Sequence, residues 1–241
     1  MGLENVTSIH GKGHPQTQSR EAWPEQQVRL SETDRVEAFS DGVFAITITL
    51  LVFGIVRPEH EPGRLLGKLI DQWPNYIAFL ASFFYVGVIW LNHHSVFVRV
   101  HYCDRGLHWV NLLLLLAIAL IPFPTAVLST ALMHGNVFDA QVAEALYAII
   151  GALMCLAWLS LFHLLSVRRY LLEPDVPPTF FPTEQLRALV GIGAYVVAGV
   201  IGWVLSPRAA LIIFLGLPIF YAVTSNGLLE TTIRWPKKIR R

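Results

Sequence analysis

Six apolar runs, each close to the length of a bilayer-crossing helix, constrain the fold of this chain more than any other feature. They extend over 36–56, 69–97, 107–128, 142–165, 186–205 and 209–229. About 20 apolar residues suffice to cross the hydrocarbon core as an α-helix. The charged residues make up only 15% of the chain and the hydrophobic residues 54%. The sequence therefore predicts an all-α integral membrane protein with six transmembrane helices per subunit.

The segments around these runs predict the division of the chain. Residues 1–34 are polar and contain no apolar core of a signal peptide, so we expect a disordered cytoplasmic arm. Residues 35–230 are expected to form the six-helix membrane domain, and 231–241 a basic cytoplasmic tail. Pro122 and Pro124 lie in the third run, where they predict a kink or break near its far end.

The basic residues predict the orientation in the membrane. Most lysines and arginines lie in the N-terminal arm, in the loops after the second and fourth runs, and in the C-terminal tail. Because positive loops favour the cytoplasmic side, we expect both termini in the cytoplasm of a cell whose plasma membrane holds the chain. A net charge of +1, distributed in this way, gives no reason to expect a nucleic-acid partner.

A polar cluster stands where the first run enters the membrane. It consists of Arg35, Ser40 and Asp41, with Phe39 directly before the serine. Charged side chains at this depth are costly unless they are paired, and they are therefore usually functional or tightly bound to a partner. The sequence predicts that a second polar cluster holds them.

That second cluster lies at the cytoplasmic end of the second run. It consists of Trp90, His93 and His94. An indole N–H can donate to a carboxylate, and an imidazole can bond to a carboxylate or a hydroxyl. We therefore predict a buried structural network that joins Trp90 and one of the two histidines to Arg35, Ser40 and Asp41. Adjacent histidines point about 100° apart on a helix, which argues against a shared metal.

Beyond Asp41, one stripe of the first run combines apolar side chains with a hydroxyl. Ile46, Thr49 and Phe53 stand at i, i+3 and i+7, so they share a helix face over about 10 Å. Periodicity alone favours an ordinary packing or lipid-facing stripe whose threonine bonds to its own helix.

The string Arg35-x-x-x-Phe39-Ser40-Asp41, followed by Trp90-x-x-His93-His94, resembles the transmembrane protein 175 (TMEM175) family of endosomal/lysosomal potassium channels. A single six-span unit resembles the prokaryotic members, which form homotetramers with a pore lined by the first helices. The resemblance implies passive K⁺ flux, moderately selective over Na⁺, by a channel that is not an enzyme. It implies K⁺ and membrane lipid as partners, K⁺ only in transit through the pore, and no cofactor or resident metal.

The resemblance also implies roles for particular residues. Ile46 would be the principal hydrophobic constriction, Thr49 a hydroxyl ring beside it, and Phe53 a further pore layer. Family members more often carry an aliphatic residue at the position of Phe53, so the resemblance does not determine the pore radius there. The residues of the family string would lie behind the pore and hold helices together. These signature residues are Arg35, Phe39, Ser40, Asp41, Trp90, His93 and His94.

Two other classes of membrane protein remain as alternatives. An intramembrane metal-dependent hydrolase would need clustered ligands, and His94, His101 and His108 recur every seven residues. However, Asp104-Arg105-Gly106 interrupts that helix, and no His-Glu-x-x-His pair is present. A secondary transporter would be expected to show inverted repeats, and the two halves of the chain show none by inspection.

Overall fold

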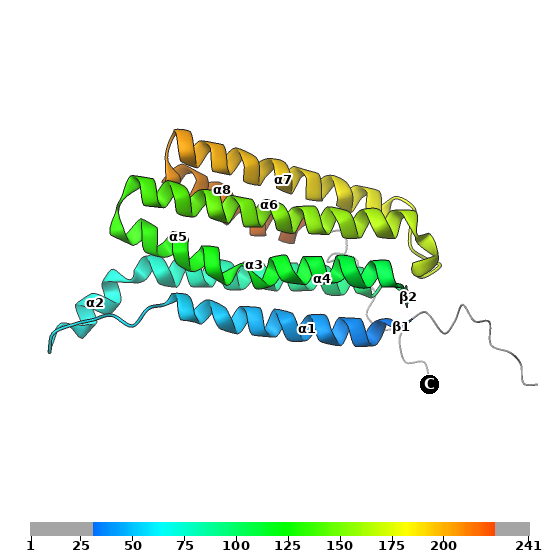
Figure 1. Ribbon diagram of the computed structural model, residues 1–241, viewed down its shortest axis with the longest axis horizontal. Helices are drawn as coiled ribbons and strands as arrows, with labels where there is room; N and C mark the ends of the chain where they lie inside the picture. Colours follow the sequence, from blue (N-terminus) through cyan, green and yellow to red (C-terminus); the bar gives the residue numbers. More distant parts are fainter. Residues whose placement is uncertain (1–30, 225–241) are drawn as a thin grey trace, which may run out of the picture.

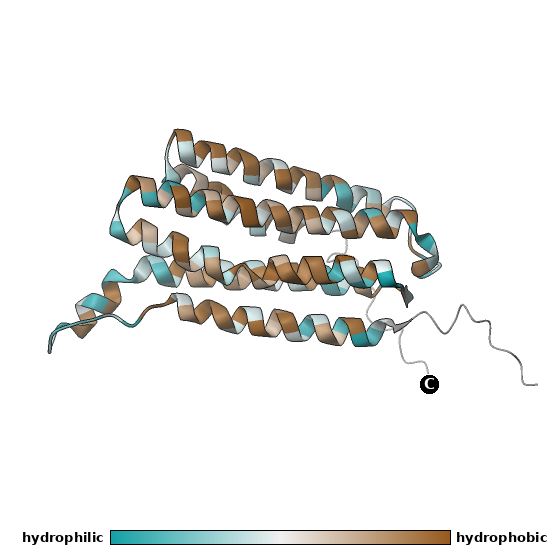
Figure 2. Cartoon of the chain, in the orientation of Figure 1, coloured by the Kyte–Doolittle hydropathy of each residue, from teal (hydrophilic) through white to brown (hydrophobic). Residues whose placement is uncertain are grey.

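The computed structural model describes residues 31–224, in which six long helices run side by side (Figure 1). The helical stretches long and apolar enough to cross a membrane are Thr33–Gly54, Trp73–Phe97, Arg105–His134, Val137–Val167, Phe180–Val204 and Pro207–Thr224. Hydrophobic residues extend along these helices, and hydrophilic residues gather at their ends and in the loops (Figure 2). The predicted all-α fold with six membrane helices is confirmed.

The first two spans differ in how they begin and end. The first comprises α1 (Thr33–Leu50) and a short 3₁₀-helix, Leu51–Gly54. The second run was expected to form one helix from residue 69, and this is wrong. The chain there forms an exposed helix, α2 (Leu65–Asp71), and a separate α3 (Trp73–Phe97). Pro74 lies in the first turn of α3, where its missing N–H needs no partner, so a new helix starts there.

Proline also divides the third span, as predicted. The span comprises α4 (Arg105–Ala119) and α5 (Pro122–His134), and the break falls immediately before Pro122. The remaining spans are single helices: α6 (Val137–Val167), α7 (Phe180–Val204) and α8 (Pro207–Thr224). The expected end of the sixth run at 229 lies outside the described residues, as do most of the N-terminal arm and the basic tail.

Helix α6 lies in the middle of the bundle and packs on α4, α5 and α7, whereas α1 lies at one edge against α3 and α4 (Figure 1). A small antiparallel pair, β1 (Ser31–Glu32) with β2 (Tyr102–Cys103), joins the start of α1 to the loop before α4. The edge position matters for function because it leaves one face of α1 without neighbours in the single chain.

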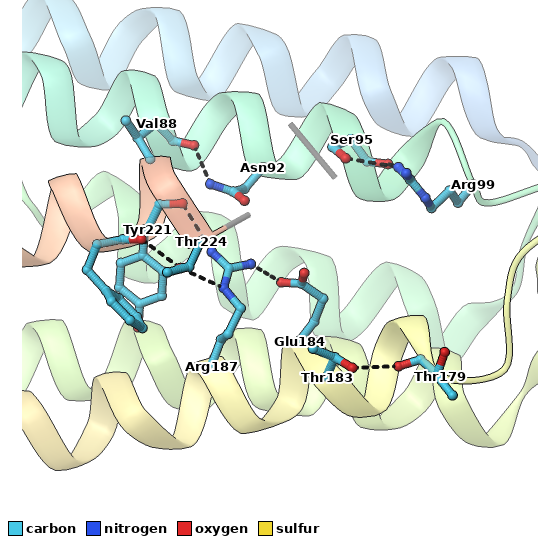
Figure 3. Close-up of polar contacts among 11 residues, drawn as sticks. Val88, Asn92, Ser95, Arg99, Thr179, Thr183, Glu184, Arg187, Tyr221 and Thr224 are labelled. Atoms are coloured by element: carbon cyan, nitrogen blue, oxygen red, sulfur yellow. Dashed lines mark hydrogen bonds and ion pairs between the residues drawn. The ribbon is translucent and has the colours of Figure 1, made fainter. Parts of the chain in front are cut away.

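A buried arginine of α7, Arg187, holds α7 to α8 (Figure 3). Glu184 and Arg187, 4% and 9% exposed, form an ion pair one turn apart on α7. The Arg187 guanidinium also donates to the hydroxyl of Thr224 and the carbonyl of Tyr221, both at 3.1 Å, at the end of α8. A cavity of about 30 Å³ borders the pair, and this volume holds about two water molecules. The arginine therefore fixes the last turn of α8 from a neighbouring helix.

Asp104 organises the loop between α3 and α4, outside the membrane spans. Its carboxylate caps α4 by accepting from the Leu107 amide at 2.8 Å, pairs with Arg168, and accepts from the Tyr170 hydroxyl at 3.0 Å. Burial by itself raises the pKa of this carboxyl. The hydrogen bonds from Leu107, Arg168 and Tyr170 outweigh that effect, so the pKa lies below its usual value.

We expect Asp104→Asn to lower the thermal denaturation midpoint at neutral pH and to flatten its acid dependence. A carboxyl with a lowered folded-state pKa stabilises the fold above its unfolded pKa of about 3.9, and this stability is lost as the pH falls through the lower folded value. Denaturation curves between about pH 6 and about pH 3 measure the effect. Asp71→Asn, at an exposed position on α2, is the matched control. Equal shifts in the two variants would contradict a stabilising role for the Asp104 charge.

Candidate functional site

Helix α1 has two faces of different character. Its buried residues are Val36, Ser40, Phe44 and Thr47, and Leu51 continues the same face into the 3₁₀-helix. The spacing of three to four residues places them on one side, which packs against α3 and α4. One face of α1 is thus fixed to the rest of the bundle.

The opposite face of α1 is exposed and apolar, with one hydroxyl. Ile46 is 61% exposed and Phe53 78%, and Thr49 is exposed between them. The Thr49 hydroxyl donates to the Ile46 carbonyl at 2.7 Å, so the expected bond to its own helix is present. Because that bond uses the hydroxyl hydrogen, the lone pairs of the oxygen remain available as acceptors. Phe39, 57% exposed, does not join the buried face, and neither does Arg35, which is also exposed.

A buried chain of hydrogen bonds ties α1 to α4 and α3. Ser40 donates to the Val36 carbonyl at 2.8 Å and accepts from the Asn111 amide at 2.9 Å. The Asn111 side-chain carbonyl lies 2.9 Å from Nε2 of His93. Since that oxygen can only accept, His93 donates from Nε2. The three side chains are almost completely buried, so the chain fixes the mutual position of the three helices.

Aromatic rings enclose His93. Its imidazole stacks on Phe97 with ring centroids 4.3 Å apart, and Phe44 of α1 meets it edge-on at 5.3 Å. Its Nδ1 atom has no hydrogen-bond partner among the described residues. An imidazole with one donor bond and an apolar enclosure is a structural anchor here.

Two further bonds join α1 to α3 nearer the surface. The Trp90 indole donates to the Asp41 carboxylate at 2.8 Å, and Nδ1 of His94 lies 2.6 Å from a Glu37 carboxylate oxygen. The Trp90 and His94 rings stack against each other, so the two bonds lie side by side. The two histidines therefore have different partners: His93 reaches Ser40 through Asn111, and His94 binds Glu37.

The structure does not pair Arg35 with Asp41, which sequence reasoning placed in one network. Arg35 is exposed and forms no ion pair or hydrogen bond within residues 31–224. The two residues are six apart, which places them about 120° apart around a helix. In the described part of the chain, the partner of Asp41 is the Trp90 indole.

Sequence reasoning missed two members of this network. Asn111 stands as a lone amide in the apolar run Leu107–Leu116, and a polar residue in such a run was the available signal. Glu37 shares a helix face with Asp41, but its partner depends on how α3 packs on α1.

The three histidines spaced by seven residues do not share a site. His94 lies against Glu37, His101 against Glu173 at 3.1 Å, and His108 against the Asp104 carbonyl at 2.7 Å. Within residues 31–224, no group of three or more His, Cys, Asp or Glu side chains is placed to hold a metal ion.

Comparison with known proteins identifies the family of this chain. The family model described as endosomal/lysosomal potassium channel TMEM175 matches residues 35–122. A protein of Chamaesiphon minutus named as a potassium channel is 39% identical over 209 residues, which cover 85% of this chain and 98% of that protein. The chain belongs to the TMEM175 family.

Two further comparisons support this family membership. A potassium channel of Streptomyces collinus is 40% identical over 167 residues, covering 69% of this chain and 80% of that protein. The crystal structure of a Chamaesiphon minutus homologue of the lysosomal potassium-selective channel TMEM175 matches with a TM-score of 0.70 and 36% identity. That match covers 80% of this chain and 98% of the homologue. Membership of a channel family favours neither the hydrolase nor the transporter alternative.

Proposed function

We propose that this chain is a potassium channel that assembles as a homotetramer around the exposed face of α1. The observation that carries the proposal is the contrast between the two faces of this helix. One face is held in the bundle by the Ser40–Asn111–His93 chain, and the other presents an exposed stripe, Ile46, Thr49 and Phe53. The relatives named as potassium channels support the same function.

In the tetramer, four Ile46 side chains would meet near the axis and form the narrowest apolar ring. An ion must shed water to pass such a ring, and Na⁺ holds its hydration shell more strongly than K⁺. Four Thr49 oxygens one turn away would replace part of that shell. Phe53 would form the next layer. The proposed pathway is therefore passive, prefers K⁺ moderately, and needs no catalytic residue or cofactor.

The signature network would act behind the pore. Asp41–Trp90, Glu37–His94 and Ser40–Asn111–His93 all join α1 to its own subunit, so they would hold the pore helix at a fixed rotation. Arg35 and Phe39, both exposed in the single chain, would then be free to contact another copy. The distribution of basic residues supports an orientation with both termini in the cytoplasm, and the bacterial relatives support a plasma-membrane location.

Flux through liposomes tests this function. Purified protein of established oligomeric mass is reconstituted with a K⁺ gradient, and K⁺, Na⁺ and H⁺ fluxes are measured separately. We expect K⁺ flux to exceed Na⁺ flux. Well-folded protein that conducts neither cation, or only protons, would refute the proposal.

We expect Thr49→Val to reduce the K⁺ over Na⁺ preference by severalfold while the tetramer persists. Valine keeps the branched shape of threonine and removes the oxygen, whereas Thr49→Ser retains the hydroxyl and should retain more of the preference. Reversal potentials under bi-ionic conditions measure the effect. Thr47→Val is the control, because Thr47 lies on the buried face of the same helix. A Thr49→Val channel as selective as the parent would assign selectivity to the apolar ring alone.

A further inference from the structure

Glu144, in the second turn of α6, is a buried carboxyl without a partner. Its side chain is completely inaccessible to solvent, and neither carboxylate oxygen has a hydrogen-bond partner among the described residues. The buried carboxyl of Glu184 differs, because the Arg187 guanidinium lies beside it. No ion pair therefore accounts for the burial of Glu144, and this residue does not belong to the proposed pore face of α1.

The neighbouring helix is shaped around this carboxyl. Gly202 of α7 lies directly against it, and a side chain at that position would overlap both carboxylate oxygens. A glycine in close helix packing is common in membranes, but here the space left by the missing side chain is occupied by the acid group. The carboxyl is thus enclosed between the backbones of α6 and α7 and does not point into a loop.

No charged group at this end of the bundle, among the described residues, neutralises a negative charge on the Glu144 carboxyl. Within residues 31–224, no charged side chain is close enough to influence it electrostatically. On α6, Asp139 is exposed; on α5 and α8, the charged residues at this end, His134 and Arg208, are also exposed.

The charged and titratable groups of α7 lie farther along that helix. Arg187 is fifteen residues from Gly202, which is about 22 Å along a helix. Tyr195 is the nearest titratable residue of α7, and its hydroxyl is bonded to Tyr85 at 2.5 Å. On α6 itself, Tyr147 packs against Phe214 of α8.

We propose that Glu144 is a proton-binding site of the folded protein, at the end of the bundle opposite the start of α1 (Figure 1). An isolated carboxylate in an apolar enclosure is far more costly than the neutral acid, so the bound ligand is a proton. To release it, the α6–α7 contact at Gly202 must admit water. The proton then leaves to that water as hydronium, and Glu144 remains as a hydrated carboxylate. The site therefore links the packing of α6 against α7 to the pH at this end of the channel.

Infrared spectroscopy of the purified protein tests the site directly. A protonated carboxyl gives a C=O stretching band that a carboxylate and an amide lack at that frequency. We expect this band at neutral pH in the parent, its loss in Glu144→Gln, and its retention in Glu184→Gln, the matched buried carboxyl. Identical spectra of the parent and Glu144→Gln, or loss of the band only in Glu184→Gln, would overturn the proposal.

A pH titration provides a second readout. If the folded protein keeps a proton that the unfolded protein releases above about pH 4.3, its stability must fall as the pH rises above that value. The thermal denaturation midpoint of the parent should therefore fall between about pH 5 and about pH 8 more steeply than that of Glu144→Gln. Glu144→Met, which is apolar and similar in size, replaces Glu144→Gln if the amide does not fold. Equal pH slopes in the parent and the variant would refute proton binding at Glu144.

Discussion

Arg187→Met is expected to lower the free energy of unfolding by about 3–5 kcal/mol, because it leaves Glu184 as a buried charge without its partner. The substitution also removes the bonds that hold Tyr221 and Thr224 at the end of α8. Thermal and denaturant unfolding in detergent measure the loss, and mass measurement shows whether oligomers persist.

The partner substitution makes this prediction specific. Adding Glu184→Gln to Arg187→Met removes the stranded charge, so the double variant should be more stable than the single one. Arg208→Met, at an exposed position in the first turn of α8, should change stability little. An Arg187→Met protein as stable as Arg208→Met would show that the buried pair is dispensable.

Ile46→Ala is expected to raise single-channel conductance severalfold and to weaken discrimination against Na⁺. Four smaller side chains widen the proposed apolar ring, so that ions cross it with more of their water. Planar-bilayer recordings with K⁺ and Na⁺ measure both properties. Ile212→Ala is a matched control, because Ile212 is a 74% exposed isoleucine on α8. Conductance unchanged in Ile46→Ala would move the constriction elsewhere, with Phe53 as the first candidate.

Most of the fold follows from local features of the sequence. Apolar length predicts the six spans, and Pro122 predicts the break between α4 and α5, because both effects act within one helix. The start of α3 was misplaced because the apolar residues of α2 continue the pattern of the next span across Gln72. Hydropathy does not distinguish an exposed apolar helix from the beginning of a membrane span.

The supporting network was predicted only in outline. Trp90 and the histidines were expected near Ser40 and Asp41, and each contact runs between helices whose relative rotation the sequence does not specify. Asn111 links Ser40 to His93 because α4 packs against α1, a contact that the sequence does not specify. Opposite charge suggested that Arg35 pairs with Asp41. A spacing of six residues on a helix, however, points the two side chains about 120° apart. The pore roles of Ile46, Thr49 and Phe53 rest on the exposed face of α1 and stay predictions.

Modification of a single cysteine tests most directly whether α1 lines the ion pathway. Ile46→Cys is introduced into a Cys103→Ala/Cys155→Ala background, and K⁺ current is recorded before and after a charged thiol reagent. The account predicts that modification abolishes most of the current at position 46, whereas Ile212→Cys, modified to the same extent by mass, retains it. Full current through channels completely modified at position 46 would contradict a pore along the exposed face of α1.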